Sequence, residues 1–182
     1  MRVIAGKARS LPLKTIEGLD TRPTTDRIKE TLFNMLQGYI PGSKFLDLFS
    51  GSGAIGIEAL SRGSEECTFI ELNNKAVNCI NDNVKFTHFK NESKIIKADA
   101  IGFLAGLKCV DYDVIFMDPP YSQGLEKQAL EVLANKEFSN DTLIVIEAIK
   151  DEDFSYVYDL GFDIIKEKLY KTNKHIFIEK RN

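Results

Sequence analysis

The stretch Phe45-Leu46-Asp47-Leu48-Phe49-Ser50-Gly51-Ser52-Gly53-Ala54-Ile55-Gly56 predicts a buried strand, a glycine turn and the start of a helix. Its apolar residues, interrupted by a single Asp, are typical of a short strand covered on both faces, as in a parallel sheet. The glycines form the pattern G-x-G-x-x-G, which allows positive φ and lets the backbone approach a ligand closely. Ile55, Ala59 and Leu60 then fall at helical spacing, so a ligand of this turn would face a helix N-terminus.

Glu71 supports a ligand at the glycine turn. It ends the predicted strand Cys67–Glu71 and lies 20 residues beyond Gly51 in the sequence. In nucleotide-binding folds, an acid at this separation from the glycine turn accepts hydrogen bonds from ribose hydroxyls. Three alternatives stay open: a turn with no ligand, a nicotinamide dinucleotide on the same turn, and an exposed Glu without a partner. Because the turn and the acid occur together, the sequence favours a nucleoside-containing ligand.

The tetrapeptide Asp118-Pro119-Pro120-Tyr121 follows the predicted buried strand Tyr112–Met117. The two prolines fix φ and supply no N–H, so the backbone leaves the strand in a rigid extended form. We therefore expect the Asp118 carboxylate, the Pro119 carbonyl and the Tyr121 ring to surround one spot beside the cofactor. The alternative is a strand-end turn with only local contacts, which two prolines between an acid and an aromatic disfavour.

The rest of the chain alternates helices and strands. Asp99, again at a strand end, either contacts an adenine amino group or caps the next helix, and the sequence alone favours the cap. Helices are predicted over Asn73–Phe86, after Asp99 and after Gly124, a short helical piece near Phe154–Tyr158, and strands over Ser93–Ala98, Thr142–Ala148, Phe162–Tyr170 and His175–Lys180, the last two as an antiparallel hairpin.

The N-terminal part is predicted to form a small β-hairpin-like extension over residues 1–20, ahead of a main domain over residues 21–182. Two short β-like runs surround the basic turn Gly6–Ser10. The following Thr21–Arg27 segment (TRPTTDR) suits the start of a helix. Arg22 and Arg27 either point at phosphate or a cofactor carboxylate, or the segment is a helix cap and nothing more.

Length and composition bound the class of protein. The 182 residues, 43% hydrophobic and 28% charged, are ordinary for one globular domain. The apolar runs are far shorter than the roughly 20 residues of a membrane span, and the N-terminus lacks the apolar core of a signal peptide, so we expect a cytoplasmic protein away from membranes. The three cysteines are widely spaced, which argues for reduced thiols and against a metal site.

The net charge of −3 is unevenly distributed. Residues 1–29 hold seven Lys/Arg against three Asp/Glu, and residues 166–182 hold six against two, so each end is +4 and residues 30–165 carry −11. An acidic body with two basic ends is typical of a chain with a polyanion-binding face. For the C-terminal run, solvated lysines on an exposed hairpin are the equally good alternative.

Together these motifs resemble the class I S-adenosylmethionine-dependent methyltransferases, and D-P-P-Y resembles the branch that methylates exocyclic amino nitrogens. Within that branch, the chain is similar over nearly its whole length to the bacterial small-subunit rRNA guanine-N2 methyltransferases (RsmD type). Leu72-Asn73 departs from the family pattern, in which many relatives carry a second acid or a larger polar residue. The stretches that carry the resemblance are Arg2–Lys7, Thr21–Arg27, Leu32–Asn34, Asp47–Gly53, Gly56–Gly63 and Phe116–Tyr121.

The resemblance implies an α/β, Rossmann-like class I methyltransferase fold. Its seven-stranded sheet would be mostly parallel with the last strand antiparallel, with helices on both faces and a small N-terminal β extension. S-adenosyl-L-methionine would lie over the glycine turn. Asp47 and the backbone of Gly51 and Gly53 would face its amino-acid part, Glu71 its ribose and Asp99 its adenine, and Ser50 and Ala100 are further expected cofactor contacts.

The implied reaction is methyl transfer to the exocyclic N2 of a guanine in 16S rRNA, free or within an assembled small subunit, by a monomer. Asp118, Pro119 and Tyr121 would be catalytic: the Asp118 carboxylate and the Pro119 carbonyl accept the amino hydrogens, and Tyr121 stacks on the base. No metal is required. The expected RNA contacts are Arg2, Lys7, Arg9, Arg22, Thr25, Arg27 and Pro120.

Rival functions exist within and outside this fold. A DNA adenine-N6 methyltransferase also uses D-P-P-Y, but it normally needs a DNA-reading insertion for which 182 residues leave little room. A protein-glutamine N5 methyltransferase usually begins this motif with Asn. A dehydrogenase shares the glycine turn and Glu71 but does not explain Asp118–Tyr121. A non-catalytic RNA-binding or assembly factor is the remaining alternative.

Overall fold

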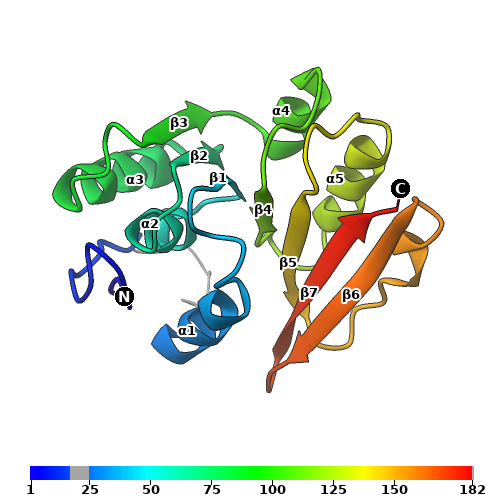
Figure 1. Cartoon of the computed structure of the whole chain (residues 1–182), viewed down its shortest axis with the longest axis horizontal. Coiled ribbons are helices and arrows are strands. Elements are labelled where there is room, and N and C mark those ends of the chain that lie inside the picture. The colour runs from blue at the N-terminus through cyan, green and yellow to red at the C-terminus, as the bar shows by residue number, and fades with distance from the viewer. Residues whose placement is uncertain (17–24, 182) are drawn as a thin grey trace.

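The computed structural model describes residues 1–16 and 25–181. In this part of the chain one sheet runs in the order β3-β2-β1-β4-β5-β7-β6 (Figure 1). Its strands are β1 (Lys44–Leu48), β2 (Glu66–Glu71), β3 (Ser93–Lys97), β4 (Val114–Met117), β5 (Leu143–Ile149), β6 (Phe162–Leu169) and β7 (Asn173–Lys180). The helices are α1 (Asp26–Met35), α2 (Ala54–Ser61), α3 (Asn74–Phe86), α4 (Ala100–Gly106), α5 (Leu125–Ala134) and the short 3-10 helix η1 (Ser155–Val157).

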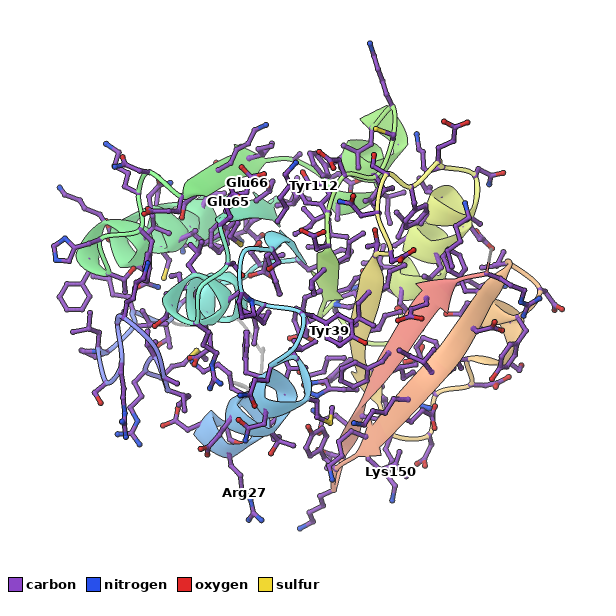
Figure 2. All side chains as sticks on the ribbon, viewed as in Figure 1. Arg27, Tyr39, Glu65, Glu66, Tyr112 and Lys150 are labelled. Atoms are coloured by element: carbon purple, nitrogen blue, oxygen red, sulfur yellow. The ribbon has the colours of Figure 1, made fainter. Side chains whose placement is uncertain are left out.

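The strand pairing confirms the predicted fold class. β1 pairs in parallel with β2 and with β4, and the parallel pairs β2–β3 and β4–β5 extend the sheet on both sides. β7 is antiparallel to both of its neighbours, β5 and β6. In Figure 2, Glu66 at the start of β2 lies in the upper part and Lys150, just after β5, in the lower part, so the carboxyl ends of β4 and β5 point downward in this view.

Helices cover both faces of the sheet, as predicted, because alternate strand residues point to opposite sides. On one face Phe45, Phe69 and Phe116 pack with buried residues of α1, α2 and α3. On the other face Leu46 and Ile115 pack with buried residues of α4 and α5. The central strands are thus buried on both sides, as expected for a parallel sheet.

The N-terminal segment folds back on itself as a hairpin-like turn. Its backbone pairs through Val3 N–H to the Leu11 carbonyl and Leu13 N–H to the Met1 carbonyl, both at 3.0 Å. Only the isolated antiparallel bridge Arg2–Pro12 forms, so the two predicted β-like runs do not become full strands. Gly6, at φ 83°, lies so close to α2 that a Cβ there would clash with the Ser61 carbonyl. Residues 17–20 of the predicted extension lie outside the described residues.

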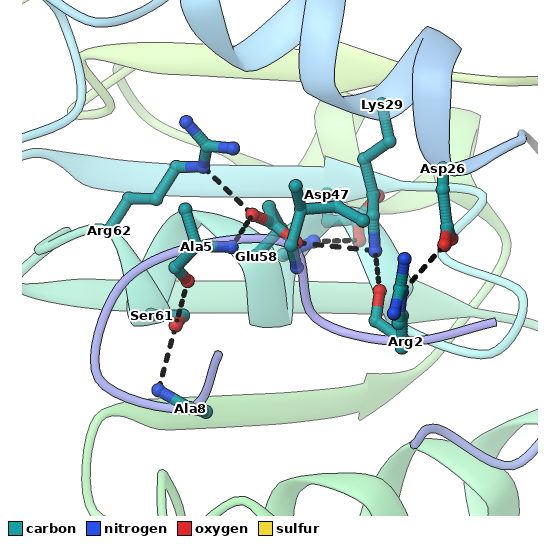
Figure 3. Close-up of polar contacts among 11 residues, drawn as sticks. Arg2, Ala5, Ala8, Asp26, Lys29, Asp47, Glu58, Ser61 and Arg62 are labelled. Carbon is teal, nitrogen blue, oxygen red and sulfur yellow. Dashed lines mark hydrogen bonds and ion pairs between the residues drawn. The ribbon is translucent and has the colours of Figure 1, made fainter. Parts of the chain in front are cut away.

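A buried charged cluster joins this segment to α1 and α2 (Figure 3). Lys29 of α1 and Glu58 of α2 are fully buried, and Lys29 Nζ lies 3.2 Å from Glu58 Oε2. Glu58 also accepts the N–H groups of Ile4 and Ala5 at 2.8 and 3.0 Å, while Lys29 Nζ donates to the Arg2 carbonyl at 2.6 Å. The cluster therefore fixes how α1 and the N-terminal segment sit against the helix that follows the glycine turn.

Several element boundaries differ from the predictions by one or two residues. The strand predicted from Tyr112 begins at Val114, because Asp113 makes backbone and side-chain hydrogen bonds to Lys44 outside the regular ladder. The second strand begins one residue earlier than predicted, at Glu66. Asn73 caps α3 through its side-chain oxygen, which accepts the N–H groups of Lys75 and Ala76.

Candidate active site

The candidate site lies where the strand order reverses, between β1 and β4. The chain leaves these two adjacent strands toward helices on opposite faces of the sheet, α2 on one and α5 on the other. Such a switch point, at the carboxyl edge, is the usual ligand position in open α/β sheets. Each of the four predicted acidic residues lies in or directly after a different strand of the sheet. Asp99 comes after β3, Glu71 ends β2, Asp47 lies in β1 and Asp118 comes after β4.

The glycine turn gives each of its glycines a different role. Gly51 has φ 54° and nothing within 4 Å of the position of a Cβ, so its backbone borders open space. Gly53 has φ 77° and is the N-cap of α2. At Gly56 a Cβ would stand 2.4 Å from the Phe69 ring and 2.5 Å from Cys67 Sγ. Gly56 therefore allows α2 to pack tightly on β2, while Gly51 leaves room for a ligand.

Glu71 contacts the glycine turn directly. Its Oε2 accepts the N–H of Gly51 at 2.9 Å, and its Oε1 accepts the N–H of Asn73 at 2.8 Å. A carboxylate oxygen has two lone pairs, so each can accept a further hydrogen bond from a ligand hydroxyl. The two residues on which the sequence based a nucleoside site are thus brought together.

Asp47 is buried beside the turn. Its Oδ2 accepts the N–H of Gly56 at 3.0 Å, at the start of α2. Burial raises the pKa of the Asp47 carboxyl to about 7, the Gly56 hydrogen bond lowers it, and the negative charge of Glu71 raises it. Ser50 is committed to the loop, since its hydroxyl donates to the Asp47 carbonyl at 2.6 Å. Contacts of Asp47 and Ser50 with the cofactor stay predictions.

Asp99 caps α4. Its Oδ2 accepts the N–H of Gly102 at 2.7 Å, which is the role that the sequence alone favoured. Ala100, the first residue of α4, is buried next to it. A contact of Asp99 or Ala100 with adenine stays a prediction.

Asp118 directly follows β4, one of the two strands between which the strand order reverses. Burial raises the pKa of its carboxyl well above the usual range, and the negative charges of Glu147 and Asp47 raise it further. Pro119 is buried and Pro120 exposed. Tyr121 is 46% exposed, so a large part of its surface remains accessible for stacking.

The predicted RNA contacts differ in how far the fold already uses them. Arg2 forms an exposed ion pair with Asp26 at 2.8 Å, and Thr25 caps α1 by accepting the N–H of Ile28. Lys7, Arg9 and Arg27 are exposed, and Arg27 points away from α1 at the lower margin of Figure 2. Arg22 lies outside the described residues.

The sequence reasoning missed a group of four hydrogen-bonded residues, one of which, Glu147, is the strand neighbour of Asp118. Glu147 of β5 is buried, with Oε1 2.6 Å from Asn173 Nδ2 and Oε2 3.1 Å from His175 Nε2. The hydroxyl of Tyr170 lies 3.1 Å from His175 Nδ1. The one signal in the sequence was a single acid within the otherwise apolar strand Leu143–Ile149.

Among the residues that the structure describes, no group of His, Cys, Asp and Glu is arranged to hold a metal ion. The search for long apolar helices in the same residues finds none able to cross a membrane.

Comparisons with known proteins agree over almost the whole chain. A family model described as conserved hypothetical protein 95 matches residues 1–179. The chain is 38% identical over 183 aligned residues to ribosomal RNA small subunit methyltransferase D of Haemophilus influenzae, covering 94% of each chain. The solved structure of yhhF from Escherichia coli is 30% identical with a TM-score of 0.87, covering 100% of this chain and 98% of that one. The structure of SMU.776 complexed with SAH, 16% identical with a TM-score of 0.68, covers 83% of this chain and 49% of that one, and shares its fold.

Proposed function

The chain belongs to the RsmD-type family described by the conserved hypothetical protein 95 model, and on that basis we propose that it transfers a methyl group from S-adenosyl-L-methionine to N2 of a guanine in 16S rRNA. The observation that carries the proposal is the position of Asp118-Pro119-Pro120-Tyr121 after β4, beside the glycine turn. A cytoplasmic location follows from the proposed substrate.

The residues at the carboxyl edge fit the cofactor. The open space at Gly51 accommodates a ligand close to the backbone, and the Glu71 carboxylate has acceptor capacity for ribose hydroxyls. Bound there, S-adenosyl-L-methionine supplies an electrophilic methyl group on a positively charged sulfur. The nearby carboxyl groups of Asp47 and Asp118 suit a cationic ligand.

Asp118 and Pro119 activate the guanine amino group. This nitrogen is a poor nucleophile because its lone pair is delocalised into the ring. The Asp118 carboxylate and the Pro119 carbonyl accept its two N–H bonds, which favours a tetrahedral nitrogen and stabilises the positive charge that develops during attack. The amino proton becomes acidic only as the new bond forms, and Asp118 or water then accepts it.

Positioning contributes the largest part of the rate. Holding the amino nitrogen in line with the methyl group supplies up to about 7–11 kcal/mol, whereas proton transfer contributes roughly 10²–10⁴-fold. The exposed Tyr121 ring stacks on the target base, and Pro120 borders it. Stacking of this kind contributes about 1–3 kcal/mol per base and requires a nucleotide that is unpaired or turned out of its stack.

RNA approaches from the carboxyl edge. In Figure 2, Arg27 and Lys150 both lie below β4 and β5, on the side toward which these strands run. These side chains, together with Lys7 and Arg9 of the N-terminal segment, hold backbone phosphates, so the affinity falls with salt.

The test is transfer of labelled methyl from S-adenosyl-L-methionine to unmodified small ribosomal subunits, to free 16S rRNA and to duplex DNA. We expect transfer to a guanine N2 of the RNA or the subunits, and the two RNA arms reveal whether assembly is required. Methylation of DNA adenine, or of another RNA atom, contradicts the proposal.

The variant Asp118→Ala tests the catalytic role of Asp118 in the same assay. We expect its kcat to fall at least about a hundredfold, because it removes an acceptor for the amino hydrogens, while its affinity for the cofactor, measured by calorimetry, stays within a few-fold of wild type. Turnover near the wild-type rate would exclude Asp118 from the chemistry.

A further inference from the structure

Asp118 has a second carboxylate beside it on the next strand. In the parallel β4–β5 ladder Met117 pairs with Ile146, so the following positions place Asp118 next to Glu147. Glu147 in turn pairs with His175 in the antiparallel β5–β7 ladder. Because side chains alternate along a strand, Asp118, Glu147 and His175 all point to the face that α1 and α2 cover.

Glu147 is held in one place. Its side chain is 5% exposed and the His175 side chain is fully buried. Asn173 donates to one carboxylate oxygen at 2.6 Å, and His175 Nε2 lies 3.1 Å from the other. Since a carboxylate oxygen accepts, Nε2 donates to it, and on the other side of the ring Nδ1 lies 3.1 Å from the Tyr170 hydroxyl. Both Glu147 oxygens are therefore fixed by residues of β7, while the β4–β5 register places Asp118 next to Glu147 on the other side.

A buried carboxylate is costly in the middle of an apolar strand, and a well-packed apolar side chain is often at least as stable. Burial and hydrogen bonding therefore do not explain Glu147 as a stabilising residue. An effect on a neighbouring residue explains Glu147 better, because a negative charge close to a carboxyl group increases the affinity of that group for a proton. Asp118 is the group that receives this effect, and Glu147 is the charged residue that acts on it most strongly.

We propose that Glu147, fixed by His175 and Asn173, is a positioning residue that acts through Asp118 and increases its affinity for the proton leaving the guanine amino group. The inference rests on the proposed function. In the step concerned, the N2 lone pair forms the bond to the methyl carbon, and the bond from that carbon to sulfur breaks with its electron pair left on sulfur. One N2 proton then passes to the Asp118 carboxylate.

Other charged groups around Asp118 have partners or effects of their own. From β1, Asp47 acts in the same direction as Glu147, and Glu71 of β2 acts on Asp47. On the covering helices, Lys29 of α1 is paired with Glu58 of α2. His175 of β7 contacts Glu147, and Tyr170, just after β6, contacts His175. Removing the charge of Glu147 alone therefore isolates its contribution.

The experiment is a direct titration of Asp118 in the free protein, followed by carbon NMR of labelled aspartate carboxyls and assigned with Asp118→Asn. In Glu147→Gln we expect the Asp118 midpoint to fall by about one pH unit, which is a tenfold loss of proton affinity. Glu179→Gln, the same change at the far end of β7, serves as the matched control and leaves the midpoint in place. An unmoved midpoint in Glu147→Gln overturns the inference.

Kinetics provide the second readout. Glu147→Gln is expected to lower the plateau value of kcat for RNA methylation, above the acidic limb of its pH profile, roughly three- to tenfold and to shift that limb downward, with KM for RNA within threefold. A change in KM alone, or an unshifted limb, contradicts a role through Asp118. If Glu147→Gln does not fold, Glu147→Asp, which withdraws the charge by one methylene, must still lower the midpoint by a smaller amount. Failure of methyl transfer by the wild-type protein would instead contradict the proposed function. The titration needs no substrate, so it tests the inference about Glu147 separately from the proposed function.

Discussion

At the scale of single residues, the buried carboxyl group of Asp47 lowers the free energy of unfolding at neutral pH. Its carboxyl group is buried next to the start of α2 and has a pKa raised to about 7. An acid with a pKa raised in the folded state binds more protons folded than unfolded between its two pKa values. Its contribution to the free energy of unfolding is therefore largest below pH 4 and falls as the pH rises through 7.

Asp47→Asn tests this cost. The amide oxygen still accepts the Gly56 N–H, but the buried charge is gone. We expect the difference in unfolding free energy between variant and wild type to move in favour of the variant by roughly 1–4 kcal/mol between pH 4 and pH 8. Urea unfolding of both proteins at a series of pH values measures this difference in unfolding free energy. If the difference does not vary with pH, the raised pKa of Asp47 is contradicted.

At the scale of elements, the contact of α2 with β2 depends on Gly56. A methyl group there would come within 2.4 Å of the Phe69 ring, and overpacking of a filled core costs about 1–3 kcal/mol. We expect Gly56→Ala to lose about that much unfolding free energy in denaturant titrations. Gly106→Ala, also in a helix but with nothing within 4 Å of the new methyl, is expected to be neutral or to gain up to about 1 kcal/mol. Equal effects of the two variants would show that packing at Gly56 is not tight.

The docking of α1 on α2 depends on Glu58. Without this carboxylate Lys29 remains fully buried with the Arg2 carbonyl as its acceptor, and breaking a buried ion pair costs about 3–5 kcal/mol. We expect Glu58→Ala to lose that much, measured by thermal and chemical unfolding. Burial already lowers the pKa of Lys29, so the loss shrinks as the pH rises and the lysine gives up its proton.

Glu131→Ala, in α5, is the control for Glu58→Ala. It removes an exposed helical ion pair between Lys127 and Glu131, whose N–O distance is 4.0 Å, and such pairs contribute only about 0.3–0.5 kcal/mol. A loss in Glu58→Ala no larger than in Glu131→Ala would mean that the buried cluster does not hold the N-terminal segment.

At the scale of the whole molecule, exposed cationic side chains lie at the carboxyl edge although the net charge is −3. Arg27 and Lys150 are exposed there. Removing one contact between a cationic side chain and a phosphate makes the slope of log affinity against log salt shallower by about 0.7–0.9. We expect Arg27→Gln and Lys150→Gln each to weaken binding of 16S rRNA and to reduce that slope by about this amount, in filter-binding titrations over a salt series.

Lys90 provides the matched control for RNA binding. It is exposed in the loop before β3, at the amino ends of the strands. Lys90→Gln is expected to leave both affinity and salt slope unchanged. If it behaves like Arg27→Gln, RNA does not approach from the carboxyl edge.

The sequence by itself determined the order of helices and strands, the glycine turn, the position of Asp47 within the first strand and those of Glu71, Asp99 and Asp118 at strand ends. These features depend on local periodicity, on glycine and proline geometry and on spacing along the chain, which are visible in a single sequence. The family resemblance added the direction of the last strand. Boundaries shifted where side chains such as Asp113 bonded to residues far away in the sequence.

Only the tertiary structure decided what lies beside what. Glu147, Asn173 and His175 are separated from Asp118 by 29 or more positions in the sequence. Strand order and register bring Glu147 to its side, and Asn173 and His175 to Glu147. The ion pair of Lys29 with Glu58 likewise joins two helices whose polar residues gave no local signal. Such contacts depend on which strands become neighbours and which faces are covered, and that outcome is set by packing of the whole chain.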